Sequence, residues 1–149
     1  MKRRTWIILA AVLVLAAAGI FFMRSAEDKV TADMVSRVER FAIQADWKPD
    51  GSVVRREMFL CISTNPCPSI AKRWYTGKKL TVDDLKAVSS TAGFSMSTEG
   101  TCTRRPSVGG LTTVCSSLGT DGVYDYALSV TSPDKETADV VVLTVEPHN

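Results

Sequence analysis

An unbroken apolar run near the N-terminus is the feature that most limits how this chain can fold. The 18 residues from Trp6 to Met23 include no charged side chain, and Lys2, Arg3 and Arg4 precede them. An α-helix of this length is about 27 Å long, which nearly matches the roughly 30 Å hydrocarbon core of a bilayer. The run is therefore predicted to cross a membrane once.

The charges on either side of this run predict its orientation. The charged residues that precede it are all basic, whereas the segment from Arg24 to Lys29 contains charges of both signs. Positive charge favours the cytoplasmic side of the plasma membrane. The N-terminus is therefore predicted to be cytoplasmic, and the part of the chain after the apolar run to be extracytoplasmic. The predicted division is a cytoplasmic basic tail (residues 1–5), a transmembrane anchor (6–23), a short tether (24–30) and an extracytoplasmic domain (31–149).

A cleaved signal peptide is the alternative interpretation of the same segment. Small residues suited to cleavage occur at Ala16 to Ala18, but the mature chain would then begin with Gly19 and four large apolar residues. A site after Ala26 places Arg24 where a small side chain is preferred. The uncleaved anchor is the favoured prediction, and a cleaved, secreted small binding protein or inhibitor is the alternative.

The rest of the chain has the composition of an ordinary globular domain. The 149 residues are 45% hydrophobic and 23% charged, with a formal net charge of +2. Lys2, Arg3, Arg4 and Arg24 are four of the 18 basic residues, so 14 basic and 16 acidic residues remain from Ser25 onward, a net charge of −2. Together with the predicted compartment, this charge excludes a nucleic acid as the expected partner.

All four cysteines follow the apolar run, on the side where disulfides form and persist. A tight turn is predicted at residues 107–110, and folding the chain back there places Cys102 opposite Cys115, within reach of a disulfide. That pairing leaves Cys61 with Cys67. A zinc or redox site is the weaker alternative, because the spacing lacks the ligand pairs of structural zinc sites and no Cys-x-x-Cys occurs.

Apolar periodicity and capping residues predict an α+β domain. Helices are expected at 32–45, at 68–76 and from the cap Thr81 to the stop at Gly93; no Gly or Pro interrupts residues 24–45, so the membrane helix can also continue into the first of them. Strands are expected at 53–62, 94–103, 111–118, 123–131 and 138–146, the last of them inside the sheet. The predicted fold is an N-terminal transmembrane helix, then an antiparallel sheet of about five strands with helices on one face, held by two disulfides.

No arrangement for catalysis is recognisable in the sequence. The only histidine, His148, is next to last, where chains are commonly frayed, so no triad and no histidine metal site is expected. Asp83 and Asp84 stand where they cap a helix. No catalytic residue, metal ligand or cofactor is predicted, and a carboxylate-based enzyme is the least favoured class. Acids near the last turns are interpreted as solubilising, with a weak calcium site as the alternative: Asp121, Asp125, Asp134, Glu136 and Asp139.

Four basic doublets are the candidate binding residues. If the fold brings them onto one side, they form an anion-attracting face toward phospholipid headgroups or an anionic wall polymer. The other interpretation is a set of separate, solvated edges. The doublets are Arg55-Arg56, Lys72-Arg73, Lys78-Lys79 and Arg104-Arg105.

The order of Cys, Pro, Trp and Gly positions resembles that of a loose class of short actinobacterial proteins, membrane-anchored or exported and of uncharacterised function. The resemblance implies a location outside the cytoplasm and disulfides, and it implies no activity. Lipidation at a cysteine, frequent in this class, is not expected here because no cysteine lies near the apolar run. The resemblance lies between Val53 and Val145 and is carried by Cys61, Cys67-Pro68-Ser69, Arg73-Trp74, Leu80-Thr81, Asp84-Leu85, Gly93 and the two later cysteines.

The sequence therefore predicts a single-pass membrane protein rather than an enzyme. The expected partners are the lipid bilayer, through Trp6 to Met23, and an envelope component that binds the exported domain. Nothing in the sequence specifies the chemistry of that component.

Overall fold

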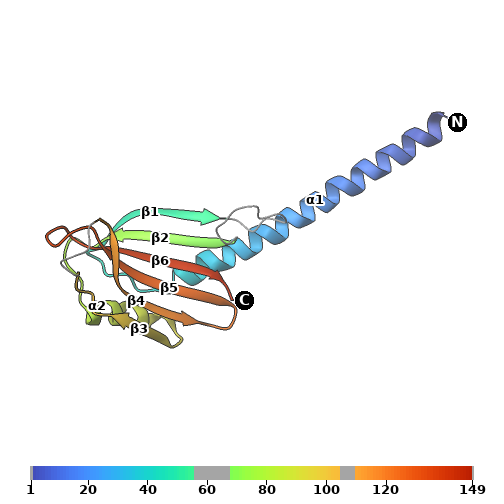
Figure 1. Ribbon diagram of the computed structural model, residues 1–149. Helices are drawn as coiled ribbons and strands as arrows, with labels where there is room; N and C mark the ends of the chain where they lie inside the picture. The colour runs from blue at the N-terminus through green and yellow to red at the C-terminus, as the bar shows by residue number, and fades with distance from the viewer. Residues whose placement is uncertain (1, 56–67, 105–109, 149) are drawn as a thin grey trace.

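The computed structural model describes residues 2–55, 68–104 and 110–148 (Figure 1). Six strands form one antiparallel sheet in the order β1-β2-β6-β5-β4-β3. The predicted α+β class is confirmed, with six strands in place of about five. The elements are α1 (Lys2–Val38), β1 (Lys48–Arg55), β2 (Ser69–Tyr75), α2 (Val82–Ser89), the 3-10 turn η1 (Ser90–Ala92), β3 (Met96–Gly100), β4 (Thr112–Thr120), β5 (Tyr124–Ser132) and β6 (Val140–Pro147).

The additional strand is β2, and the helix predicted for residues 68–76 is wrong. Ile70 and Trp74 are spaced by about one helical turn, which favours a helix, but residues four apart also share a face of a strand. In the structure both are buried on the same face of β2, which lies between β1 and β6. A short segment with this ambiguous spacing takes its conformation from the strands on either side of it.

Strand β1 begins before the predicted position. Trp47, Pro49, Asp50 and Gly51 have the composition of a turn, yet the last three belong to β1, where a register shift between Pro49 and Ser52 accommodates them. β1 is an edge strand, and Pro and Gly are tolerated at edges and bulges. Residues 56–62 of the predicted strand lie outside the described residues.

The four later strands form the predicted meander. In β5, Tyr124, Tyr126, Leu128 and Val130 are buried, and the residues between them are half-buried or exposed, as the alternation predicted. Strand β6 lies between β2 and β5, which confirms that it is interior. Helix α2 has the predicted capping box, in which the Thr81 hydroxyl accepts from the Asp84 amide and the Asp84 carboxylate accepts from the Thr81 amide.

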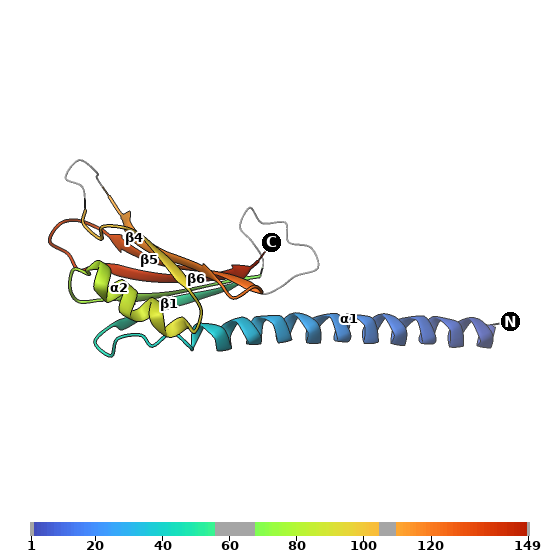
Figure 2. The same cartoon turned by 90° about the horizontal axis from the view of Figure 1, so that it is seen from below.

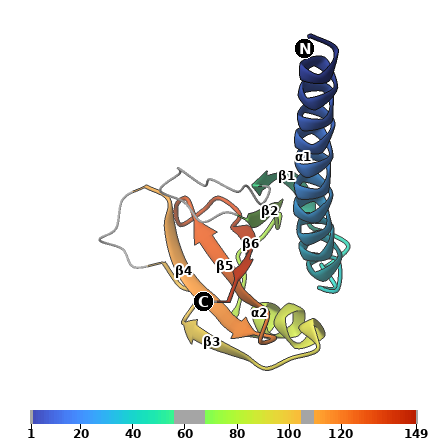
Figure 3. The ribbon, with the colours of Figure 1, turned by 90° about the vertical axis from the view of Figure 1, so that its right-hand side faces the viewer.

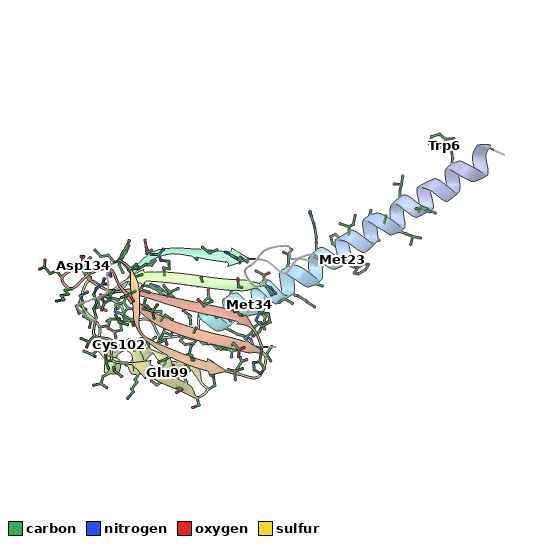
Figure 4. The ribbon with its side chains drawn as sticks, viewed as in Figure 1. Trp6, Met23, Met34, Glu99, Cys102 and Asp134 are labelled. Atoms are coloured by element: carbon green, nitrogen blue, oxygen red, sulfur yellow. A yellow bond between two sulfur atoms is a disulfide. The ribbon has the colours of Figure 1, made fainter. Side chains whose placement is uncertain are left out.

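Helix α1 is continuous over 37 residues. Residues 24–30, predicted as a tether, are helical, so the apolar segment continues directly into the part that packs on the sheet (Figures 1 and 4). Trp6 is 72% exposed, whereas Met34 is fully buried against the domain. The predicted end near Ala45 is too late, because the helix ends at Val38.

Both helices lie on the same side of the sheet (Figures 2 and 3). The C-terminal turns of α1 contact β2 and β6, and α2 contacts β3, β4 and β5. Met34, Val38 and Phe41 are buried there, and the Phe41 ring contacts Tyr126 at 5.9 Å between centroids. Burial of these side chains supplies the main stabilisation of a domain of this size. The opposite face, called the open face below, has neither α1 nor α2 on it.

One of the two predicted disulfides is formed, between Cys102 and Cys115, with 4.7 Å between their Cα atoms. Cys61 and Cys67 lie outside the described residues. The register differs from the prediction by two residues, because Gly100, and not Cys102, lies opposite Cys115 in the β3–β4 pair. Cys102 follows β3 and turns back toward β4 with a positive φ of 54°.

Candidate functional site

The last turns of α1 are joined to the turn between β4 and β5 by a cluster of polar side chains. Arg37 donates from Nε to Asp33 Oδ2 at 2.9 Å and from Nη1 to Asp121. Its guanidinium also lies over the Tyr124 ring, 4.9 Å from the centroid. Tyr126 donates its hydroxyl hydrogen to Asp121 Oδ2 at 2.8 Å. These contacts fix the direction in which α1 leaves the domain.

The same contacts control the ionisation of Asp121. Burial opposes its charged form, but hydrogen bonds from the Tyr124 amide, the Tyr126 hydroxyl and the Val123 amide, with the charge of Arg37, outweigh this and lower the pKa of Asp121 to about 2. Burial and the hydrogen bond to Asp121 raise the pKa of Tyr126 to about 12. Asp121 is therefore an ionised structural group at neutral pH.

A second polar cluster lies at the other end of the sheet, away from the point where α1 leaves the domain. This end of the sheet is called the far end below. Asp139, fully buried there, accepts from Lys79 Nζ at 3.1 Å and from the Leu80 amide at 2.9 Å. Lys79 also donates to the Ser132 hydroxyl at 2.8 Å and to the Asp134 carbonyl. A buried carboxylate needs such partners, and these hold Lys79 in place.

A pocket of about 340 Å³ opens beside this cluster. Arg104 donates to the carbonyl of Ser132 and, at 2.6 Å, to that of Gly110. Cys102 and Asp134 mark this end of the domain in Figure 4. Three cationic side chains and two hydroxyls thus share one concave surface. The lining includes Lys79, Cys102, Thr103, Arg104, Ser132 and Lys135.

A third feature is a shallow hollow of about 610 Å³ on the open face, near the β4–β5 turn. It contains Asp125 on β5 and Glu146 on β6, which lie directly opposite each other. His148, expected to be frayed, is held there by its amide, which donates to the Val123 carbonyl, and by its Nδ1, 2.7 Å from Asp125 Oδ1. Small side chains of Ala127 and Thr144 form the floor.

No family model, curated protein or solved structure matches this chain. Within the described ranges, no three His, Cys, Asp or Glu side chains lie together so as to hold a metal ion. The function must therefore be inferred from the geometry of these three features.

The acids near the last turns, interpreted as solubilising, lie in separate places and do not form a single site. Asp121 pairs with Arg37 near α1, and Asp139 pairs with Lys79 at the far end. Asp134 binds the Glu136 and Thr137 backbone amides and the Thr137 hydroxyl, which lower the pKa of Asp134 to about 2. These three carboxylates thus pair with cations or accept hydrogen bonds from turn residues.

The basic doublets are distributed over different parts of the domain. Arg55 lies opposite Ser69 in the β1–β2 register, at one end of the strand pair. Lys48 and Tyr75 lie at the other end, which is the end nearer to Lys79, so Arg55 is far from Lys79. Lys72 and Arg73 are neighbours in β2 and so point to opposite faces; Arg73 forms an ion pair with Asp50 at 3.3 Å. Lys78 pairs with Asp84 at 3.4 Å. Arg56 and Arg105 lie outside the described residues.

Of the candidate residues, Lys79 and Arg104 are brought together in the far-end pocket. Sequence analysis missed Lys135, the third cation there, because an isolated lysine between turn acids carries no local signal. It also missed Arg37, whose i, i+4 spacing to Asp33 is common on exposed helices.

Proposed function

We propose that this protein is a single-pass membrane protein that holds a non-enzymatic binding domain close to the outer surface of the plasma membrane. The observation that carries the proposal is the continuity of α1. This helix is long and apolar enough to cross a membrane, and it runs without a break to side chains in the domain core. A rigid connection of this kind is useful to a protein that remains anchored.

The helical connection limits how far the domain can lie from the bilayer. Met23 is the last residue of the apolar run and Met34 is the first fully buried core residue on α1. At 1.5 Å per residue the helix between them is about 16 Å long. The domain therefore lies next to the headgroups, and the Arg37 cluster sets its tilt.

The proposed orientation has the N-terminus in the cytoplasm. The basic residues Lys2, Arg3 and Arg4 precede the span, which favours retention of that end inside. The disulfide between Cys102 and Cys115 supports an oxidising compartment for the domain. The resemblance to anchored or exported actinobacterial proteins agrees with the same location.

A secreted binding protein is the second candidate, and one observation favours it. Residues 10–26 are exposed, and the packed part of α1 begins near Val30. Cleavage after Ala18 or Ala26 would therefore leave every core residue that the structure describes in the mature chain. The domain would remain folded but would lose its fixed position at the bilayer.

Fractionation with N-terminal sequencing separates the two candidates. We expect the intact chain in the membrane pellet after carbonate washing, with the domain of intact cells or right-side-out vesicles accessible to protease. A mature chain in the medium that starts near Gly19 or Glu27 would replace the anchor by the secreted form. In-cell crosslinking followed by mass spectrometry then tests for the proposed envelope partner, with an Arg40→Ala variant as a matched surface control.

A further inference from the structure

The far-end pocket concentrates positive charge on a domain that is slightly acidic as a whole. Lys79, Arg104 and Lys135 line it, and no carboxylate is among the described residues of its lining. The hydroxyls of Thr103 and Ser132 lie in the same wall and can donate or accept hydrogen bonds. A pocket of about 340 Å³ is at the lower end of the size range of small-molecule sites and is large enough for a phosphoryl group.

We propose that this pocket binds a phosphoryl group of the ligand that the domain recognises. Lysine and arginine are the usual protein partners of phosphate oxygens. Asp139 balances the charge of Lys79, so the two further cations, Arg104 and Lys135, match a doubly charged tetrahedral group better than a single carboxylate. The proposal rests on the binding role proposed above and names the chemical class of the ligand.

Two of the cations are held in position before any ligand arrives. Lys79 is fixed by the buried carboxylate of Asp139 and by Ser132. Arg104 donates to two main-chain carbonyls, and the disulfide at Cys102 ties its segment to β4. A ligand that binds to ordered side chains loses less conformational entropy than one that must order them.

Lys135 provides the adjustable contact. It is exposed in the turn between β5 and β6, and within the described part of the chain its side chain makes no hydrogen bond or ion pair. A lysine on such a turn can move toward an anion in the pocket without breaking an existing contact. It is also the position where a substitution changes the pocket charge with little effect on folding.

The position of the pocket restricts the source of the phosphoryl group. Asp134 and Cys102 lie at the end of the domain opposite to Trp6 and Met23 (Figure 4). Headgroups of the bilayer that α1 crosses are therefore out of reach. The ligand is a soluble phosphorylated molecule or a phosphate-bearing polymer of the envelope.

The test uses the full chain in nonionic detergent micelles and titration calorimetry with pyrophosphate. We expect saturable binding with a Kd below about 1 mM at low ionic strength, weakened at least fivefold in about 0.5 M NaCl. Lys135→Glu should weaken binding by about tenfold or more, since it reverses one of the two charges in the lining that Asp139 does not balance. Lys86→Glu, an exposed lysine of α2 outside this pocket, should leave it within twofold.

Absence of pyrophosphate binding, or equal binding by the wild type and Lys135→Glu, would overturn the proposal. In a second arm, the same protein is transferred from micelles to phosphatidylcholine nanodiscs. Flotation then measures whether these nanodiscs bind to phosphatidylglycerol vesicles. If the vesicles bind the wild type but not Lys135→Glu, and pyrophosphate does not bind, the proposal would also be overturned. The ligand would then be a lipid of another membrane. The fractionation experiment is independent, because pyrophosphate binding can fail in a protein that is correctly anchored, and can succeed in a cleaved one.

Discussion

Arg37 and Asp121 form an ion pair although 84 residues separate them in the sequence. The pair joins the last turn of α1 to the turn between β4 and β5. Their side chains are only 18% and 13% exposed. This contact, together with the buried side chains of Met34 and Val38, holds the end of α1 against the domain.

Removing Arg37 should therefore destabilise the domain. We expect Arg37→Ala to lower the free energy of unfolding by about 2 to 3 kcal/mol, because Asp121 would keep its charge in a largely buried place without its main counter-ion. Urea unfolding followed by tryptophan fluorescence measures this, since Trp47 and Trp74 are 4% and 8% exposed. Arg40→Ala, at an exposed position one turn on, should change it by less than about 0.5 kcal/mol.

A double-mutant cycle tests whether the pair itself is responsible. Asp121→Ala alone should also be destabilising, and the combination with Arg37→Ala should cost less than the sum of the two single changes, with a coupling of about 1 to 2 kcal/mol. Strict additivity would show that the two residues act independently and would contradict the role given to the pair.

The stability of the domain should decline in acid partly through Asp121. Its pKa is about 2 in the folded chain and near 3.8 without the fold. The stabilisation from the carboxylate is therefore complete above about pH 4 and is lost as the pH falls toward 2. The difference corresponds to about 1 to 2 kcal/mol after allowance for partial solvent screening.

Urea unfolding at pH 7, 4, 3 and 2.5 measures this loss. Asp121→Asn should be less stable at pH 7 but should lose less stability between pH 4 and 2.5 than the wild type. Tyr126→Phe removes one donor to the carboxylate and should reduce the acid dependence in part. Parallel profiles for the wild type and Asp121→Asn would assign the acid loss to other carboxylates.

A tight approach between β3 and β4 makes Gly100 sensitive to substitution. Its φ is +86°, and an added Cβ would lie 2.6 Å from the Val114 carbonyl oxygen. Gly122 has a similar φ of +85° but open space around it. We expect Gly122→Ala to cost about 1 kcal/mol for the backbone strain alone, and Gly100→Ala about 2 kcal/mol more. Equal melting temperatures for the two variants would contradict the close approach.

Local sequence signals were sufficient for elements whose boundaries are marked by turn and capping residues. Thr81 with Asp84 marks the start of α2, and Asp121-Gly122, a dipeptide favoured in hairpin turns, lies between β4 and β5. They failed for β2, because the four-residue spacing of Ile70 and Trp74 fits both a helix and a strand. Only the neighbouring strands decide between the two, and their positions are a property of the whole sheet.

The candidate sites were harder to predict for a related physical reason. Lys79 and Arg104 were recognised as basic residues, but the pocket needs Lys135 from another turn to complete its charge. Asp139 looked like a solubilising acid and is instead fully buried beneath Lys79. Burial and pairing across long sequence separations depend on the tertiary packing, which charge patterns along the chain do not record.

The disulfide should both stabilise the domain and hold one wall of the far-end pocket. Cys102 and Cys115 are 13 residues apart, and a loop of this length predicts a loss of about 3 kcal/mol when both are replaced by serine. Because Thr103 and Arg104 directly follow Cys102, the same double variant should also weaken pyrophosphate binding while the protein is still folded. Urea unfolding, and calorimetry at a temperature well below the unfolding transition, measure the two effects separately. A double variant that unfolds like the wild type would show that the strands alone fix this end of the sheet.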